Sequence, residues 1–176
     1  MLSEESVVNK DYIVPIKGLS TGKYQFDYII DSQLFVQFEE SMISAADVNV
    51  CLTLDKQPSF ININGVFKGV VTTACDRCLE DVIIELNFES SLMVKFTKER
   101  EKEEVDEIMV LDPSESELDL SQFYYDYITL ALPLQRVHKK GECNPQMVEK
   151  IEGISNNNEV EQKKSSPFDK LKNLMN

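Results

Sequence analysis

Residues 82–96, VIIELNFESSLMVKF, form the longest alternating stretch of the chain, because every second position from Val82 to Phe96 is apolar except Ser90. A period of two indicates a β-strand with one buried face. Residues 48–54 and 61–71 show the same alternation. These three stretches predict half-buried antiparallel strands, whose apolar faces need a second layer to cover them.

The flanking sequence supplies the other expected elements. Residues 11–19 and 23–30 are predicted as short strands around a turn at 20–22, and residues 108–111 as a brief strand. Residues 32–40 favour a short helix that Asp31 could cap. The clearest helix is expected near 119–132, with Asp119 and Gln122 forming a capping box and Pro133 ending it. The predicted class is α+β: a mainly antiparallel sheet that can curl toward a barrel, with this helix packed on it.

The domain organisation follows from the polar segments. Residues 1–153 are predicted to form a single α+β domain that contains an acidic loop at 98–107 and a short helix at 144–153 ending at Gly153. Residues 154–166 are predicted to be a disordered linker. A short C-terminal helix at 167–175 would dock on a partner through Phe168, Leu171, Leu174 and Met175.

The composition is that of a globular protein, with 42% hydrophobic and 28% charged residues among 176. There is no secretory signal and no apolar window of membrane-spanning length, so we expect a cytoplasmic protein without a membrane partner. The net charge of −13 is unevenly distributed, because residues 99–120 carry ten acids against two cations. The rest of the chain is therefore only mildly acidic and could present a local basic face.

Two cysteines three positions apart, in ACDRCLED at 74–81, lie between two predicted strands and therefore at a hairpin tip. Two thiolates at such a tip can form half of a tetrahedral zinc site, and His138 and Cys143 in RVHKKGEC could complete it. The candidate cofactor is one structural zinc on Cys75, Cys78, His138 and Cys143. Reduced structural thiols and a redox dithiol of Cys75 and Cys78 remain as alternatives. Cys51, in a strand, is expected to be an ordinary packed or half-exposed thiol.

The same segments carry four cations, Arg77, Arg136, Lys139 and Lys140. If the segments meet, these side chains could contact RNA phosphates; otherwise they are ordinary solvated charges. The sequence lacks a nucleophile elbow, a phosphate-binding glycine loop and the common zinc-protease motif, and it contains one histidine. We therefore expect a non-enzymatic protein without a small-molecule substrate.

Several motifs occur in a specific order: CDRCLED, an acidic stretch, ITLALPLQRVHKKGEC, a polar linker and a terminal SPFDKLKNLMN. In this order the chain resembles the YceD family of bacterial and plastid proteins, which is linked to accumulation of large-subunit ribosomal RNA. The resemblance runs from about residue 60 to the end and more weakly over the N-terminal strands. The matching positions are Cys75, Arg77, Cys78, Leu132, Pro133, His138, Cys143, Phe168 and Leu171. The chain departs from some relatives because no further cysteine follows Cys143.

The resemblance implies a non-enzymatic ribosome biogenesis factor that acts on the large (23S) ribosomal RNA or on a ribosomal protein. Two binding mechanisms are open. The four cations could contact ribosomal RNA, or the acidic segment could hold a basic ribosomal protein while the terminal helix docks on a partner. The alternatives are a thiol oxidoreductase that uses Cys75 and Cys78, and a structural zinc-binding interaction module.

Overall fold

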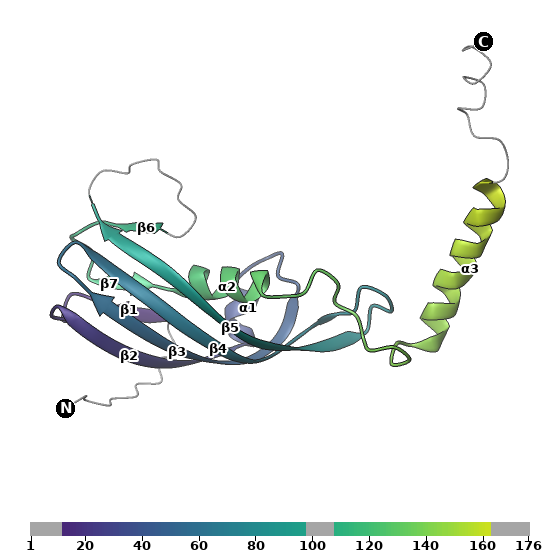
Figure 1. Ribbon diagram of the computed structural model, residues 1–176, viewed down its shortest axis with the longest axis horizontal. Coiled ribbons are helices and arrows are strands. Elements are labelled where there is room, and N and C mark those ends of the chain that lie inside the picture. The colour runs from purple at the N-terminus through teal and green to yellow at the C-terminus, as the bar shows by residue number, and fades with distance from the viewer. Residues whose placement is uncertain (1–11, 98–107, 163–176) are drawn as a thin grey trace, which may run out of the picture.

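The predicted alternating strands pair into one long, twisted antiparallel sheet, seen in a computed structural model that describes residues 12–97 and 108–162 (Figure 1). The strand order is β2-β3-β4-β5-β6, antiparallel except that β6 runs parallel to the end of β5. The strands span Gly22–Asp31 (β2), Ile43–Lys56 (β3), Phe60–Ala74 (β4), Asp81–Phe96 (β5) and Ile108–Leu111 (β6). The sheet is open, with β2 and β6 at its edges, so the expected curl into a barrel is not confirmed. Strand β6 pairs with only four residues of β5, and within the described residues it does not pair with β2, so the sheet does not close.

The core lies on one face of this sheet, as the alternation predicts. Along β3, the side chains of Val48, Val50, Leu52 and Leu54 are fully buried, and their odd-numbered neighbours are exposed or half-exposed. Helices α1 (Ser32–Val36) and α2 (Ser121–Leu130) contribute the covering side chains, among them Tyr124 of α2, which contacts four aromatic rings of the core. The prediction that the helix near 119–132 forms the second layer is confirmed.

The predicted capping box of α2 is wrong. The helix begins after Leu120, and the side chain of Gln122 bonds Asp126 at 2.7 Å instead of reaching back to the helix start. Asp119 still accepts the N–H of Ser121 at 2.8 Å. The physical reason is that Asp119 belongs to the short strand β7 (Glu117–Asp119), which holds its backbone in an extended conformation.

The N-terminal strands form as predicted but do not pair with each other. Strand β1 (Ile13–Pro15) pairs antiparallel with β7 in a separate two-stranded sheet, and β2 pairs with β3. The connection between β1 and β2 is held by Lys56, whose ammonium donates to the carbonyls of Ile16 and Leu19. The predicted helix at 32–40 shortens to α1, and Asp31 caps it through the N–H of Gln33 at 2.9 Å.

The C-terminal helix is longer than the sequence predicted. Helix α3 runs from Pro145 to Gln162 and continues through Gly153, so the predicted helix end at Gly153 is wrong. A glycine inside a helix costs about 1 kcal/mol relative to alanine, which an exposed helix tolerates. The helix occupies the first part of the predicted linker 154–166. The rest of the linker, the docking helix at 167–175 and the acidic loop at 98–107 lie outside the described residues.

Two further features place the candidate site. The β4–β5 hairpin extends away from β6, and its tip meets the loop that leads from α2 to α3 (Figure 1). Helix α3 starts at this tip and points away from the sheet. None of the helices in the described part of the chain has the length and apolar character needed to span a bilayer.

Candidate metal centre

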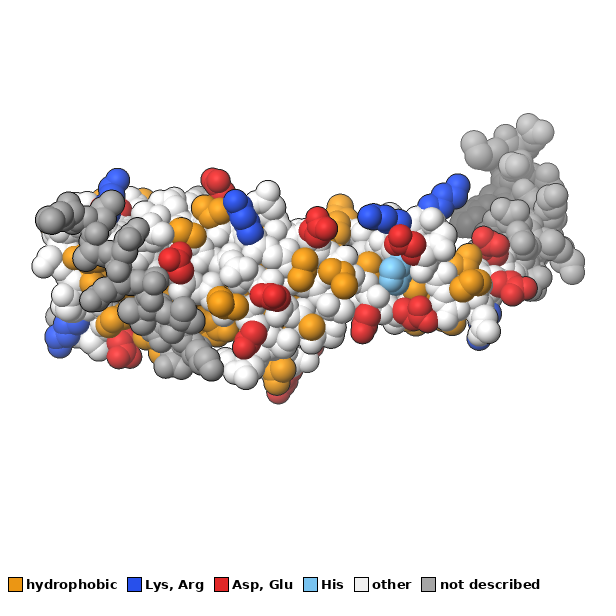
Figure 2. Space-filling view, turned by 90° about the horizontal axis from the view of Figure 1, so that it is seen from below, with side chains coloured by type: hydrophobic (Ala, Val, Ile, Leu, Met, Phe, Trp, Pro, Cys, Tyr) orange, Lys and Arg blue, Asp and Glu red, His pale blue; other side chains and the backbone are white. Residues whose placement is uncertain are grey.

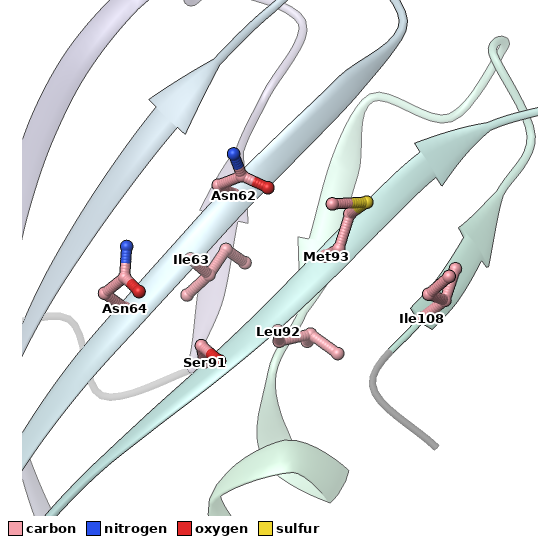
Figure 3. A pocket seen from close by; sticks show the side chains of 7 residues that line it. All are labelled: Asn62, Ile63, Asn64, Ser91, Leu92, Met93 and Ile108. Carbon is pink, nitrogen blue, oxygen red and sulfur yellow. The ribbon is translucent and has the colours of Figure 1, made fainter. Parts of the chain in front are cut away.

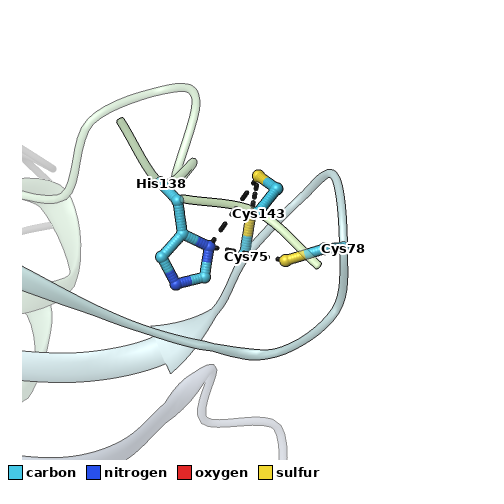
Figure 4. Close-up of side chains that lie close together, drawn as sticks. All are labelled: Cys75, Cys78, His138 and Cys143. Atoms are coloured by element: carbon cyan, nitrogen blue, oxygen red, sulfur yellow. Dashed lines mark hydrogen bonds between the residues drawn. The ribbon is translucent and has the colours of Figure 1, made fainter. Parts of the chain in front are cut away.

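Three cysteines and the single histidine converge at the hairpin tip (Figure 4). Cys75 and Cys78 come from the β4–β5 connection, whereas His138 and Cys143 come from the loop between α2 and α3. Their four potential ligand atoms all lie within 4.8 Å of one another. The three cysteines are buried, and the structure thus brings together the four residues that the sequence selected as candidate ligands.

The spacing of these atoms matches a tetrahedral zinc site. The Sγ atoms of Cys75 and Cys143 are 3.9 Å apart, and Nδ1 of His138 lies 3.4 Å from Sγ of Cys78 and 3.9 Å from Sγ of Cys143. Zinc–ligand bonds of about 2.3 Å to sulfur and 2.0 Å to nitrogen give tetrahedral edges of about 3.8 Å and 3.5 Å. A disulfide would need the sulfurs at about 2.05 Å, and all four cysteines are free. The donor set and spacing fit a metal ion held by four protein ligands.

The turn that carries the first two ligands is closed by its own backbone. The N–H of Cys75 donates to the carbonyl of Glu80 at 2.8 Å, and the N–H of Leu79 donates to the carbonyl of Cys75 at 2.9 Å. The N–H of Arg77 points at Sγ of Cys75 at 3.5 Å. Leu79 has a left-handed φ of 63°, a conformation that costs a leucine about 1 kcal/mol. The turn therefore presents backbone N–H groups to sulfur as well as the two thiols to an ion.

The thiols differ in their acidity. Burial raises the pKa of Cys75, but the backbone N–H groups of Cys78, Arg77 and His138 outweigh it and lower that pKa to about 6. Burial and the neighbouring thiols raise the pKa of Cys143. The hairpin thus lowers one thiol pKa through its own backbone N–H groups, without a helix N-terminus. A cation at the centre would favour the thiolate form of all the cysteines together.

The orientation of the His138 ring is fixed by a hydrogen bond on the side away from the cysteines. Its Nε2 lies 3.0 Å from the carbonyl oxygen of Asp81. Because a carbonyl can only accept, Nε2 carries the proton in this contact, and Nδ1 is the atom that faces the cysteines. A histidine ligand whose second nitrogen donates to a backbone carbonyl is the usual arrangement at protein metal sites.

Polar contacts fasten the loop to the hairpin on both sides of the cluster. Asp76 and Arg136 bind each other through backbone and side chain: the N–H of Asp76 donates to the Arg136 carbonyl at 2.7 Å, and the guanidinium lies 2.8 Å from the carboxylate. The backbone N–H and the guanidinium of Arg136 lower the pKa of Asp76. Asn144 donates to Glu80 at 2.6 Å and caps α3 by accepting the N–H of Gln146 at 3.0 Å. The sequence analysis missed the Asp76–Arg136 and Glu80–Asn144 pairs, because no local pattern links positions about 60 residues apart.

A small second apolar cluster surrounds the ligands. It is separate from the main core and consists of buried Val82 and the three cysteines, with Val137, Met147 and Val148 packed against them. Met147 and Val148 belong to the first turn of α3. The position of α3 therefore depends on the same cluster that holds the candidate ligands.

The predicted cationic group assembles only in part. Arg77, Arg136, Lys139 and Lys140 all lie at the tip, but Arg136 is paired with Asp76, and Nη1 of Arg77 points at Sγ of Cys143 at 3.7 Å. Lys139 and Lys140 are exposed. Figure 2 shows acidic as well as basic side chains around the histidine, so the tip is a mixed surface and not a purely basic one.

Two pockets in the described part of the chain are lined by strand residues and contain none of the four candidate ligands. One of about 350 Å³, beside the start of β6, is lined by Asn62, Ile63, Asn64, Ser91, Leu92, Met93 and Ile108, none of which titrates near neutral pH (Figure 3). Another, of about 370 Å³, lies at Cys51 and Asp27 on the sheet. Cys51 is half-exposed, and burial together with Asp27 raises its pKa, which suits an unreactive thiol.

Comparison with known proteins identifies a family. The model of the family described as "Large ribosomal RNA subunit accumulation protein YceD" matches residues 63–175. The match covers the β4–β5 hairpin, all four candidate ligands and α3. It confirms the resemblance seen in the sequence motifs. No curated protein and no solved structure matches the chain.

Proposed function

Because the chain belongs to the YceD family, we propose that it supports accumulation of large-subunit ribosomal RNA in the cytoplasm as a non-enzymatic binding factor. The described pockets support a binding role. One has no side chain that titrates near neutral pH, and the other holds Asp27 and Lys68 beside Cys51, a thiol whose pKa is raised. The family description supports the link to large-subunit RNA. The partner is then ribosomal RNA or a protein of the assembling subunit.

The proposal includes one structural zinc on Cys75, Cys78, His138 and Cys143. The observation that carries it is the close approach of these four ligand atoms, all within 4.8 Å of one another. Four protein ligands leave no open position for substrate or water, which is the arrangement of structural and not catalytic zinc. Bound there, zinc would supply a cross-link between segments that are about 60 positions apart in the chain.

At the tip, this cross-link holds the basic side chains in place. The loop from Arg136 to Cys143 has no regular secondary structure, and its described polar contacts to the hairpin involve Asp76, Asp81 and the ligands. We propose that Arg77, Lys139 and Lys140 contact RNA phosphates, with Arg136 serving to bind the loop to Asp76. Three phosphate contacts would give a slope of log affinity against log salt of about −2 for single-stranded RNA.

Ultraviolet crosslinking to a fragment of large-subunit ribosomal RNA tests this contact. The double variant Lys139→Glu with Lys140→Glu should lose most of the crosslink, because it replaces two attractions with two repulsions. The matched control is Lys23→Glu with Lys95→Glu, which makes the same change of net charge on exposed positions of the sheet. Equal losses in both variants would show that net charge alone governs binding and would overturn the tip as the RNA contact.

A thiol oxidoreductase is the second candidate, because the pKa of Cys75 is about 6. The buried position of Cys75 and the surrounding ligand set favour the metal site instead. A redox dithiol would form a reversible Cys75–Cys78 disulfide under mild oxidation even in protein supplied with zinc. Mass spectrometry after mild oxidation distinguishes the two, since zinc-bound thiols should remain reduced.

For the C-terminal segment, we propose that Phe168, Leu171, Leu174 and Met175 dock on a partner. These residues lie outside the described part of the chain, and the support is their apolar spacing of three and four positions. Deleting 167–176 should reduce association with assembling subunits without altering zinc content. Unchanged association would remove this proposal.

A further inference from the structure

The outer face of the sheet is not covered by any described element. Side chains alternate between the two faces of each strand, and those on the inner face form the core beneath α1 and α2. On the outer face of β2, β3, β4 and β5, every side chain in the cross-strand rows from Lys23 to Asp31 is exposed or half-exposed. This face is therefore available to a partner as far as the described residues go.

One row across this face carries three carboxylates. Asp31 of β2 lies opposite Asp47 of β3, Asp47 lies opposite Val70 of β4, and Val70 lies opposite Glu85 of β5. Neighbouring strands are about 4.8 Å apart, so these carboxylates share a narrow band. Like charges directly opposite each other destabilise a sheet. Asp31 accepts the N–H of Gln33, which offsets part of its own charge but adds no cation.

The described structure offers these carboxylates no cationic partner. Arg136 with Asp76, at the distant tip, is the ion pair found among the described residues. The row that contains Asp27 of β2 and Glu89 of β5 lies two rows further along the strands and adds two more acids. The row between the two acidic rows contains one cation, Lys68 of β4. The central part of the face therefore carries an excess of negative charge that the described residues do not neutralise.

Exposed aliphatic side chains accompany the acids. Val70 is 37% exposed within the acidic row, Ile29 is 52% exposed in the next row and Ile83 is 68% exposed at the opposite side. Apolar side chains that are exposed beside charges can pack against the side chains of a partner. The long aliphatic stems of lysine and arginine pack on such side chains while their charged ends reach nearby carboxylates.

We propose that the outer face of β2–β5, centred on Asp31, Asp47, Val70 and Glu85, binds a lysine- and arginine-rich polypeptide segment. Charge complementarity favours a basic polypeptide and disfavours RNA, because the carboxylate row repels phosphates. This inference rests on the proposed non-enzymatic binding role and names the class of partner. The partner would be a cationic protein segment whose charge must be screened before the segment joins an RNA-rich particle. The acidic row acts in place of the phosphates that such a segment meets later.

Fluorescence anisotropy with a fluorescein-labelled dodecamer of L-lysine tests the face in the full-length protein. Asp47→Asn with Glu85→Gln should weaken binding about tenfold at low salt, a value in line with about 0.7 kcal/mol for each exposed charge contact. Glu115→Gln with Glu117→Gln removes the same charge from exposed positions off the face and should change binding less than twofold. Equal weakening by both pairs would overturn the proposal, since attraction would then follow net charge alone.

A second measurement locates the peptide independently of affinity. A dodecamer with a photoreactive residue at its centre should crosslink to outward-facing residues of β3, β4 and β5, and crosslinks confined to 99–120 or to the tip would overturn the proposal. Zinc content separates this inference from the proposed function. The Asp47→Asn with Glu85→Gln variant should keep the wild-type zinc content and RNA crosslinking. If it loses peptide binding and keeps both of these, the peptide binds the outer face and the proposed function is unaffected. If Lys139→Glu with Lys140→Glu loses RNA crosslinking but still binds the peptide, the change affects the RNA contact at the tip and leaves the outer face intact.

Discussion

Replacing Cys143 with serine should release zinc from this protein, whereas replacing Cys51 should not. Structural zinc contributes about 10–16 kcal/mol of apparent binding free energy in small zinc-dependent peptides. Shared equally among the four ligands seen here, about 2.5–4 kcal/mol falls to Cys143, which corresponds to a Kd raised roughly 100- to 1000-fold. The assay is zinc stoichiometry by mass spectrometry of metals after dialysis against a chelator of known affinity. Wild-type protein should retain one zinc per chain, and the Cys143→Ser variant close to none.

The Cys51→Ser variant is the matched control, because Cys51 is half-exposed on the sheet and is not among the candidate ligands. It should retain the wild-type zinc content. Retention of zinc at wild-type affinity by Cys143→Ser would refute the four-ligand assignment. Loss of zinc from both variants would show that the effect comes from general destabilisation and not from a ligand. Hydrogen exchange of residues 134–150 should rise in Cys143→Ser alone, since this segment packs on the cluster.

Three further changes test the local physics of the fold. Leu79→Gly should raise the free energy of unfolding of the zinc-loaded protein by about 0.5–1 kcal/mol in urea denaturation, because φ is 63° at this exposed position. The control Leu134→Gly, at another exposed position, should lower the free energy of unfolding. Gly69→Ala should lower the free energy of unfolding by about 2–4 kcal/mol in thermal denaturation, because the added Cβ would clash with the backbone carbonyl oxygen of Asp47 in β3. Gly18→Ala, with nothing within 4 Å of the added Cβ, should be nearly neutral. Burial raises the pKa of Tyr28 to about 12 from 10, so its contribution to stability is complete below pH 10 and is lost as pH rises through 12. The phenolate absorbance of Tyr28, taken as the difference between the wild type and Tyr28→Phe, should then rise together with the loss of circular dichroism above pH 10. Appearance of this difference signal at pH 10 without unfolding would contradict the burial.

The sheet was predictable because its signal is local. Alternation from Val82 to Phe96 requires only that neighbouring side chains point to opposite faces, and that rule holds for each strand alone. The pairing of β1 with β7 joins residues more than 100 positions apart, and no turn connects them. Nothing in the sequence near Ile13 distinguishes this partner from the adjacent β2. The start of α2 was misplaced for the same reason, because the pairing of β7 holds Asp119 in a strand.

The four candidate ligands could be predicted from the sequence, but the groups that position them could not. Cysteine and histidine are rare enough in this chain that three cysteines and one histidine could be selected by residue type and context. The carbonyl of Asp81, the carboxylate of Asp76 and the amide of Asn144 are common groups that acquire their roles only when the loop meets the hairpin. Sequence reasoning also treated Arg136 as free to bind RNA, although its charge is already matched by Asp76.

The second apolar cluster indicates what a metal ion would contribute at the tip. Its fully enclosed members are three cysteines and Val82, which together bury far less apolar surface than the main core. Fixing each backbone residue of the irregular loop costs about 1–2 kcal/mol in conformational entropy, whereas burying a valine contributes about 1.5–3 kcal/mol. A loop of this length, held by so few apolar contacts and by the Asp76–Arg136 ion pair, which solvent weakens, would not stay closed on the hairpin by packing alone. An ion bound by all four ligands would supply the missing interaction at the junction where α3 leaves the body of the protein.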